Sequence, residues 1–376
     1  MVVGAQIKTM KLFAKSKNFS YPIFIGSEIL NIIPREVTKF TKSKKILILI
    51  DRFLAKKFQK KLNKIFERDG FECIFLKVIA GKKCKELNTL LKIIDILDKN
   101  KFSKDSTLLA FGGGTIGDLG GFAASIYYRG LNLVQIPTTL TAQIDSSVGG
   151  KVAINYNNNI NAIGNYYHPK LIICDYNFIK SLPKRDFLSG LSEVIKSALI
   201  SSKKQTNFLK NNSEKILRKN EKIILNMVSR IIKIKLDHVT RDEREKNVRM
   251  FLNYGHTIGQ AIESSFPLKL EHYRHGEAVA LGMLCVSFIA ENFFKINGIY
   301  KDHITIFKKF KMPLKIKRFS KTKKKISEII FNNISKDKKK NHSGIRYILL
   351  NGIGNPKIIS NVDNNLIKES IFRHVK

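Results

Sequence analysis

The first half of the chain alternates short apolar runs with stretches of helical spacing, and this alternation restricts the possible folds more than any other feature. The predicted strands are Lys45–Ile50, Glu72–Val78, Thr107–Phe111, Leu133–Ile136 and Leu171–Cys174, and residues 54–69, 86–99 and the stretch that ends near Ser125 have helical spacing. Strands that alternate with helices form βαβ units, and fully apolar strands belong in parallel sheets covered on both faces. We therefore predict a Rossmann-like, doubly wound, mainly parallel sheet.

The pattern becomes mostly helical after Pro183. Helical spacing covers residues 186–201, 220–239, 257–265, 276–295 and 322–335, and one late strand is expected near Arg346–Leu350. A chain of 376 residues is too long for one ordinary core and suits two domains. We predict an α/β domain at residues 1–185 and a helical domain at residues 186–376, with the active site in the cleft between them.

The formal net charge of +38 raises the question of a nucleic-acid partner. The excess lysines are spread along the chain together with many Ile and Asn residues, and no basic stripe is interleaved with aromatic residues. Biased codon usage explains this charge better than nucleic-acid binding, so we expect neither a nucleic-acid partner nor a nucleic-acid groove.

Three further features concern the compartment of the protein. The N-terminus lacks a sustained apolar segment of the kind found in signal peptides, and no run approaches about 18 uninterrupted apolar residues, so we expect no membrane association. The scattered cysteines Cys73, Cys84, Cys174 and Cys285 form no CxxC pair, which favours a reducing cytoplasm.

A glycine-rich turn, Gly112-x-Gly114-x-x-Gly117, follows the predicted strand at Thr107–Phe111. Glycines at such a turn let backbone N–H groups approach a pyrophosphate at a helix N-terminus. The pattern alone is weak, because it lies in an interior unit of the sheet and lacks the acidic residue expected about 20 positions later. A plain tight turn between a strand and a helix is the alternative interpretation.

Two histidines, His256 and His275, each lie beside a glycine at the start of a probable helix. With Glu193 they would form a three-ligand metal site with open positions, which suits catalysis better than structure. Lys196 lies three residues after Glu193 on the same helix face, where an exposed ion pair is the alternative. A single histidine is usually not a ligand, and we expect none of His238, His272 and His303 to be one.

Further polar residues could bind an anionic, hydroxylated substrate. The segment Ile136–Lys151 is dense in hydroxyl groups and also contains Asp145, although capping of a helix would explain its Thr and Ser residues equally well. Lys235, Arg249 and Asn253 approach the predicted metal ligands in sequence, but singly each is more typical of a surface charge or a helix cap.

Taken together, these motifs resemble the 3-dehydroquinate synthase family. The resemblance runs from about Tyr21 to about Leu350, and its most specific stretches are Gly112–Asp118, Tyr128–Gly130, Pro137–Lys151, Ser189–Lys196, Asp242–His256 and His275–Gly282. It implies a phosphorus–oxygen lyase of the shikimate pathway that uses NAD and a divalent metal, zinc or cobalt. The implied reaction converts 3-deoxy-D-arabino-heptulosonate 7-phosphate (DAHP) to 3-dehydroquinate and phosphate by transient oxidation, phosphate elimination, reduction, ring opening and aldol closure.

The resemblance also implies roles for individual residues. Metal ligation falls to Glu193, His256 and His275. NAD binding falls to Asp51, Lys85, Gly114, Thr115, Ile116, Gly117, Asp118, Thr138, Thr139, Lys151, Phe178, Ile179, Lys180 and Ser181. Substrate binding falls to Arg129, Asp145, Lys151, Asn161, Lys196, Lys235, Arg249, Asn253 and one of Lys338 and Lys339. Catalytic roles fall to Lys151, Lys196, Glu243, Arg249 and Asn253, and Arg129 would reach the neighbouring subunit of a homodimer.

Three positions depart from the family's pattern: Lys82 replaces a glutamate that contacts the NAD ribose, Ile160 replaces a lysine, and Gln260 replaces a second histidine. The main alternatives are other sugar-phosphate cyclases and metal-dependent alcohol dehydrogenases of similar fold. A basic nucleic-acid-binding protein is the least favoured alternative.

Overall fold

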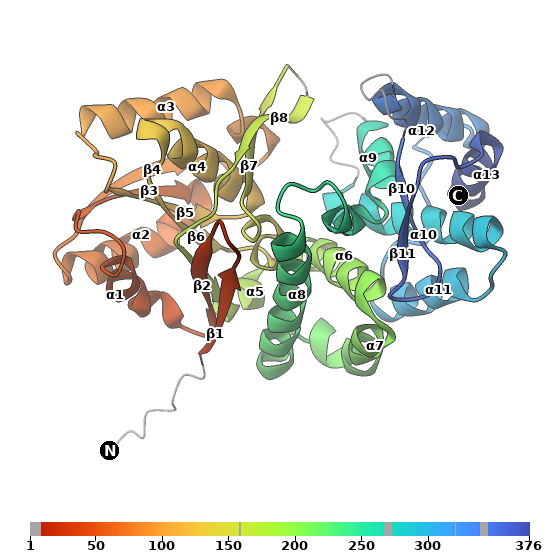
Figure 1. Cartoon of the computed structure of the whole chain (residues 1–376), viewed down its shortest axis with the longest axis horizontal. Helices are drawn as coiled ribbons and strands as arrows, with labels where there is room; N and C mark the ends of the chain where they lie inside the picture. Colours follow the sequence, from red (N-terminus) through yellow and green to blue (C-terminus); the bar gives the residue numbers. More distant parts are fainter. Residues whose placement is uncertain (1–8, 158, 267–272, 320, 339–344) are drawn as a thin grey trace. The chain divides into compact units, whose positions relative to one another are not determined.

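The computed structural model describes residues 9–157, 159–266, 273–319, 321–338 and 345–376 (Figure 1). The chain divides into two compact units. The first comprises Met1–Leu182 and Ile224–Thr240, and the second comprises Pro183–Ile223 and Arg241–Lys376. The segment Ile224–Thr240 thus groups with the α/β unit rather than with the helical domain predicted at residues 186–376, and its Lys235 bonds to Asp145 of that unit.

The first unit is built on a sheet of seven described strands. Their order is β1 (Met10–Lys15), β2 (Ser20–Gly26), β9 (Leu171–Asp175), β6 (Asn132–Pro137), β5 (Thr107–Gly112), β3 (Lys45–Asp51) and β4 (Glu72–Val78). All neighbours are parallel except β1 and β2, which pair antiparallel. The predicted mainly parallel sheet is confirmed, and the two N-terminal strands, which sequence analysis did not predict, extend it at one edge.

Each face of this sheet carries its own apolar core because successive side chains of a strand point to opposite faces. On β3, Ile46, Ile48 and Ile50 belong to one core, and Leu47 and Leu49 belong to the other. Figure 1 shows α1 (Ile33–Val37) and α2 (Arg52–Glu67) on one side, and α3 (Leu87–Lys99) and α4 (Gly114–Ile126) on the other. This is the doubly wound arrangement.

Shorter elements complete the first unit. They are the turns η1 (Ile29–Ile32), η2 (Lys82–Cys84), η3 (Tyr127–Arg129) and η4 (Ala142–Ser146), the helix α5 (Tyr176–Ser181), most of α8 (Glu221–Arg241) and the antiparallel hairpin of β7 (Lys151–Tyr156) and β8 (Asn159–Tyr166). The hairpin was not predicted, and it places Lys151 at the start of a strand.

The second unit is mostly helical, as predicted. Its helices are α6 (Lys184–Ser201), α7 (Lys203–Leu217), η5 (Val248–Asn253), α9 (His256–Ser264), α10 (His275–Phe294), α11 (Ile299–Lys309), α12 (Lys323–Lys338) and α13 (Asn364–His374), and β10 (Tyr347–Leu350) pairs antiparallel with β11 (Pro356–Ile359). Sequence analysis did not predict α7, α11, α13 or β11.

The helix α10 is the core of the second unit. By length and composition it could cross a membrane, but 72% of its most apolar window is buried inside the protein, which is typical of a core helix. It crosses α9 at very short range, because a Cβ atom on Gly282 would lie 2.1 Å from the carbonyl oxygen of Gly255. Both helices begin with a histidine, so this crossing brings the two imidazole rings to within 5.3 Å of each other.

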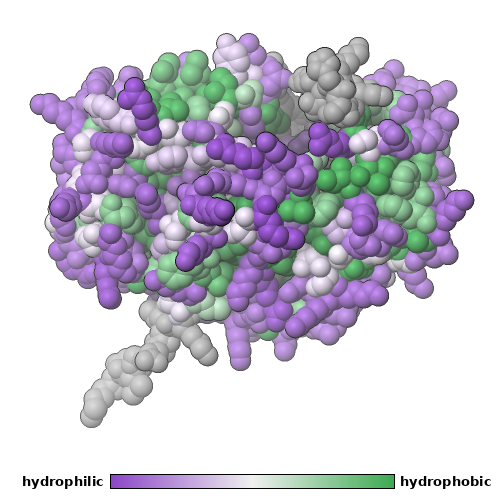
Figure 2. Space-filling view, in the orientation of Figure 1, coloured by the Kyte–Doolittle hydropathy of each residue, from purple (hydrophilic) through white to green (hydrophobic). Residues whose placement is uncertain are grey.

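Hydrophilic side chains are distributed over the whole visible face of the molecule, interspersed with apolar ones (Figure 2).

Candidate active site

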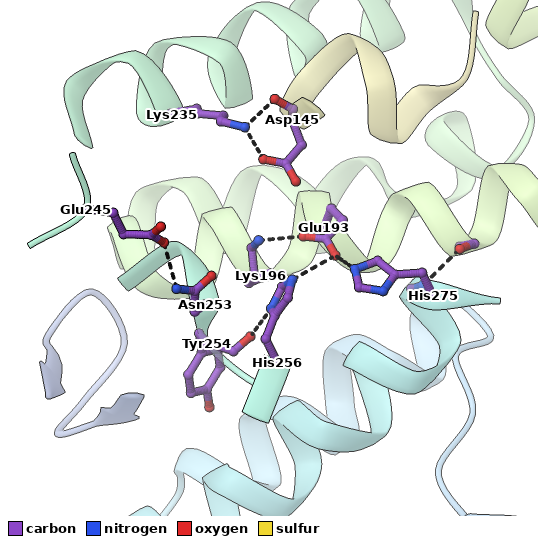
Figure 3. Close-up of polar contacts among 11 residues, drawn as sticks. Asp145, Glu193, Lys196, Lys235, Glu245, Asn253, Tyr254, His256 and His275 are labelled. Atoms are coloured by element: carbon purple, nitrogen blue, oxygen red, sulfur yellow. Dashed lines mark hydrogen bonds and ion pairs between the residues drawn. The ribbon is translucent and has the colours of Figure 1, made fainter. Parts of the chain in front are cut away.

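Three potential metal ligands come together in the second unit (Figure 3). Glu193 lies in the middle of α6 and is 1% exposed, and His256 and His275 are the first residues of α9 and α10. The Nε2 atoms of His256 and His275 lie 3.8 and 3.6 Å from Oε1 of Glu193. One donor atom from each of the three residues lies within 4.8 Å of the other two.

The spacing of these donors fits one divalent ion. Three donors placed tetrahedrally at zinc-bond lengths of about 2.0–2.1 Å would be roughly 3.4 Å apart, slightly less than the separations observed. Two neutral imidazoles and a carboxylate also match the ligand chemistry of catalytic zinc and similar ions, with positions left for a substrate. The His275 side chain is 44% exposed, so this side of the cluster is open to solvent.

The N-terminus of α10 is fixed against α6 by close packing and by paired charges. A Cβ atom on Gly276 would lie 1.9 Å from the carbonyl oxygen of Ser189, so only glycine allows this contact. Arg185 of α6 donates two hydrogen bonds of 2.8 Å to the Glu277 carboxylate, which also accepts from the backbone N–H of Arg274 at 2.9 Å. These contacts determine where His275 stands relative to Glu193.

Lys196 is buried beside the metal-ligand cluster. Its Nζ atom lies 2.5 Å from Oε2 of Glu193, and its side chain is 2% exposed. The alternative of an exposed ion pair on a helix surface is therefore wrong. This places a cation at the buried side of the cluster.

The residues before α9 form a loop that holds Arg249. The Asp242 carboxylate accepts hydrogen bonds from the backbone N–H groups of Lys246, Asn247 and Arg249, at 2.7–3.1 Å. Burial raises the pKa of Asp242, but these hydrogen bonds outweigh it and the pKa is lowered. The Arg249 guanidinium is buried and donates to the backbone carbonyl oxygen of Glu243.

Glu245 is a site residue that sequence analysis did not single out. Its carboxylate accepts a 2.7 Å hydrogen bond from Nδ2 of Asn253. The backbone of Glu245 has a φ of 57°, in the left-handed region. Residue spacing does not predict such a conformation at a glutamate.

In the first unit, several predicted NAD-binding residues lie where neighbouring parallel strands end. Asp51 ends β3, the glycine-rich turn follows β5, and Thr138 follows β6. In open α/β sheets, ligands bind at this carboxyl edge. At two of the turn's glycines the space for a side chain is small, since a Cβ atom on Gly114 would lie 2.9 Å from Oγ of Ser146 and one on Gly117 would lie 2.7 Å from Oε1 of Gln135, so these side chains would have to shift.

Several residues of the predicted NAD set also have structural roles. Asp51 caps α2 by accepting from the N–H groups of Phe53 and Leu54, and it accepts from Ala80 as well. The Thr139 hydroxyl accepts from the backbone of Ala142 at 3.2 Å. In the segment Phe178–Ser181, Phe178 and Ile179 are buried, while Lys180 and Ser181 are exposed.

Lys85, Asp118 and Asn161 form a second polar cluster in the first unit. The buried Lys85 ammonium donates to Oδ2 of Asp118 at 2.6 Å and to Oδ1 of Asn161 at 2.5 Å. Burial raises the pKa of Asp118 and outweighs the lowering effect of Lys85. Asn161, predicted to bind the substrate, thus lies with two residues predicted to bind NAD.

The remaining predicted substrate residues of the first unit are placed separately. Lys235 of α8 bonds to both the carboxylate and the backbone carbonyl of Asp145 (Figure 3). Lys151 is exposed at the start of β7. Arg129 is exposed in η3, where it and Tyr128 have φ values of 63° and 47°.

Comparison with known proteins assigns the family. The 3-dehydroquinate synthase N-terminal family matches residues 75–189, and the 3-dehydroquinate synthase C-terminal family matches residues 190–340. The chain is 37% identical over 338 residues to 3-dehydroquinate synthase from Clostridium beijerinckii, covering 89% of this chain and 93% of that protein. It is 36% identical to the enzyme from Thermodesulfovibrio yellowstonii, covering 93% of this chain and 96% of the relative. The chain belongs to the 3-dehydroquinate synthase family.

Solved structures support the fold of this 3-dehydroquinate synthase family member. A 2-epi-5-epi-valiolone synthase from Streptomyces hygroscopicus with NAD⁺ and Zn²⁺ bound superimposes with a TM-score of 0.84 at 22% identity, covering 96% of this chain and 98% of that one. A 2-deoxy-scyllo-inosose synthase complexed with carbaglucose-6-phosphate, NAD⁺ and Co²⁺ has a TM-score of 0.81 at 22% identity, covering 97% and 100%. The predictions of the family, the fold class and an enzyme of this family are confirmed.

Some predicted positions of this family member lie outside the described residues. Lys339 and His272 are among them, and the side chains of Lys338 and Lys82 are not described either. The other two departures from the family's pattern are exposed: Ile160 is 61% exposed on β8, and Gln260 lies on the exposed side of α9. His303, predicted not to be a ligand, is fully buried and bonds to the Tyr254 hydroxyl at 2.8 Å.

Proposed function

We propose that this protein is a 3-dehydroquinate synthase that converts DAHP to 3-dehydroquinate and phosphate in the shikimate pathway. The observation that carries the proposal is the cluster of Glu193, His256 and His275 with the buried Lys196 beside it, found in a member of this family. A divalent ion and a set of buried cations together suit a hydroxylated acid phosphate. A simple polyol carries no phosphate or carboxylate, so its binding would need the metal but not the buried cations.

The metal would be held by Glu193, His256 and His275, and zinc and cobalt are both compatible with these ligands. When bound, it supplies a Lewis acid that polarises a substrate hydroxyl. NAD would lie on Asp51, Lys85, the turn Gly114–Asp118, Thr138, Thr139, Lys151 and the segment Phe178–Ser181. When bound, it supplies the hydride acceptor that is restored at the end of each cycle.

The protein's own residues bind and orient the substrate. Lys196, Arg249 and Asn253 supply hydrogen-bond donors in the second unit, and both Lys196 and Arg249 are buried. In a buried setting such cations stabilise the charge that develops as phosphate leaves more strongly than they would in water. The proton removed in this elimination passes to the departing phosphate, so no separate protein base is required there.

The other proposed substrate residues are Asp145, Lys151, Asn161 and Lys235 of the first unit, one of Lys338 and Lys339, and Glu243 in a catalytic role. Asp145 and Lys235 support each other through their ion pair, so each holds the other's side chain in place. Holding the substrate's many polar groups in one orientation is the main contribution that such residues make to rate.

We further propose a cytoplasmic homodimer in which Arg129 reaches the phosphate pocket of the neighbouring subunit. The exposed position of Arg129 on a turn of positive-φ residues supports this role. All four cysteines are free, which suits a reducing compartment.

The test is a substrate panel with protein supplied with NAD and either Zn²⁺ or Co²⁺. We expect phosphate release from DAHP, and little from other sugar phosphates at equal concentration. His275→Ala, which removes one ligand, should abolish this release and lower the bound metal content. Preference for a different sugar phosphate would indicate a related cyclase, and oxidation of simple alcohols without phosphate release would indicate a dehydrogenase.

A further inference from the structure

The two metal-ligand histidines have different acceptors at their outer ring nitrogens. Nδ1 of His256 lies 3.3 Å from the backbone carbonyl oxygen of Tyr254, and Nδ1 of His275 lies 3.0 Å from Oε2 of Glu263. In both rings Nε2 is the nitrogen nearest to Glu193. One histidine is thus supported by a neutral carbonyl and the other by a carboxylate.

Glu263 reaches His275 because of its position on α9. It lies seven residues after His256, which is about two helical turns, so both residues lie on the same face of α9. One helix therefore supplies a metal ligand at its first residue and the carboxylate that contacts the second histidine ligand. The Glu263 side chain is 14% exposed, so this contact is partly shielded from water.

A carboxylate at Nδ1 has two physical effects on a histidine ligand. It holds the proton on Nδ1, which leaves the Nε2 lone pair for the metal, and it fixes the orientation of the ring. It also makes the imidazole a more basic donor, because the negative charge polarises the N–H bond. A backbone carbonyl such as that of Tyr254 produces the first effect with much less of the second.

We propose that Glu263 is a positioning residue that sets the affinity of the metal site through His275. This inference rests on the metal centre of the proposed function and adds a residue outside the ligand set. His275 is the more exposed of the two histidines, with a side-chain exposure of 44% against 13% for His256. His275, the more exposed histidine, is therefore the one whose Nδ1 contacts a carboxylate.

The test is a titration of metal-free protein with Zn²⁺ in competition with a chromophoric chelator. Glu263→Gln keeps the size and an acceptor oxygen but removes the charge, and Glu263→Ala removes both. We expect the dissociation constant for Zn²⁺ to rise by about 10–100-fold in Glu263→Gln and by more in Glu263→Ala. Ser264→Ala, the neighbouring exposed position of the same helix, is the matched control and should bind Zn²⁺ like the wild type.

Two further readouts separate positioning from general stabilisation. The melting temperature of the metal-free protein should be the same in Glu263→Gln and the wild type, because the proposed role concerns the ring and not the fold. In the Zn²⁺-bound protein, the Nδ1–H proton of His275 should give a low-field NMR signal that moves upfield in Glu263→Gln.

The outcomes distinguish this inference from the function on which it rests. Zn²⁺ affinity in Glu263→Gln equal to that of the wild type would overturn the role of Glu263 and leave the metal centre intact. A lower melting temperature of metal-free Glu263→Gln, together with unchanged Zn²⁺ affinity, would also overturn the role of Glu263. Failure of wild-type protein to bind Zn²⁺, or unchanged binding in His275→Ala, would overturn the metal centre itself and the inference with it.

Discussion

At the scale of single residues, the site depends on which side-chain or backbone atom of each residue makes the hydrogen bonds and ion pairs. The backbone carbonyl oxygen of Glu243 accepts from Arg249, and the carboxylate of Glu245, two residues later, accepts from Asn253. Lys196 is a buried partner of Glu193 rather than a surface charge. Residue type and spacing do not distinguish these cases, because they depend on loop dihedrals and on burial.

The first prediction compares these two glutamates. Glu245→Ala removes a charge-assisted hydrogen bond to Asn253, which is worth about 1.5–3 kcal/mol, so kcat/KM for DAHP should fall by roughly 10–100-fold. Glu243→Ala leaves this hydrogen bond in place and removes a carboxylate with a proposed catalytic role, so it should also lower kcat/KM for DAHP. Steady-state kinetics of both variants under saturating NAD and metal would decide, and a wild-type kcat/KM in Glu245→Ala would contradict the role of the hydrogen bond to Asn253.

The second prediction concerns Lys82, which stands where the family has a glutamate that contacts the NAD ribose. A carboxylate accepts hydrogen bonds from ribose hydroxyls and an ammonium group cannot. Lys82→Glu should therefore tighten NAD binding by about tenfold, or about 1.4 kcal/mol, with little change in turnover at saturating NAD. The measurement is an NAD titration of both proteins. Equal or weaker binding in the variant would mean that position 82 does not face the ribose.

At the scale of elements, helix crossings place the three proposed metal ligands. The crossing of α9 and α10 depends on glycines at backbone contact, and the contact between α10 and α6 depends on Gly276 and on the Arg185–Glu277 pair. The helical spacing of the sequence predicts that these helices exist and that His256 and His275 open two of them. It does not predict the distance between the helices, because that distance depends on which glycines face which backbone.

The elements that sequence analysis missed are short or weakly patterned. The strand β8 is exposed along nearly its whole length and lacks the apolar signal of a buried strand, so the β7–β8 hairpin was not predicted. The helix α7 was missed although its buried residues Thr206, Leu209, Ser213 and Ile216 lie three or four positions apart, because two of the four are polar. The buried central strands were predicted to within about two residues, because their runs are apolar throughout.

The third prediction is that Gly282→Ala destabilises the protein, although a glycine-to-alanine change within a helix usually stabilises it. Replacing a mid-helix glycine with alanine normally stabilises a helix by about 1 kcal/mol. Here the added Cβ would lie 2.1 Å from the Gly255 carbonyl oxygen and 2.6 Å from the Gly259 backbone nitrogen. Gly282→Ala should therefore destabilise the protein by about 1–3 kcal/mol or more and weaken Zn²⁺ binding as α9 and α10 separate. A raised melting temperature with normal Zn²⁺ affinity would contradict the described crossing.

The fourth prediction concerns the pH dependence that Glu277 confers on the start of α10. Burial raises the pKa of Glu277, but the hydrogen bonds from Arg185 and from the backbone of Arg274 outweigh it, so the pKa falls below its usual 4.5. A lowered pKa in the folded state stabilises the protein above pH 4.5 and loses this contribution as the pH falls further. Glu277→Gln should cost about 1 kcal/mol at pH 7, a modest amount because Arg185 is half exposed.

Melting temperatures of metal-free protein, measured from pH 7 down to pH 3, test this account. The difference between wild type and Glu277→Gln should shrink as the pH falls below about 4.5. A constant difference across that range would mean that the carboxylate's charge does not stabilise the helix start.

At the scale of the whole molecule, the proposed homodimer makes a prediction about mixed subunits. If Arg129 completes the partner's phosphate pocket, Arg129→Ala and His275→Ala damage different halves of each site. Refolding equal amounts of the two inactive variants together should recover roughly a quarter of the wild-type activity, since about half of the dimers are mixed and each has one complete site. Phosphate release from DAHP measures it. No recovery in a sample shown to contain mixed dimers would place Arg129 outside the partner's site.

The central claim is that the oxidation is transient and that phosphate elimination lies within the cycle. The most direct measurement follows DAHP conversion by the metal-loaded protein with NAD, recording phosphate, 3-dehydroquinate and NADH in the same sample. We predict one phosphate for each 3-dehydroquinate formed over many turnovers, with no accumulation of NADH beyond the amount of enzyme. NADH that accumulates in step with substrate consumption, without phosphate release, would contradict this account and identify a simple dehydrogenase.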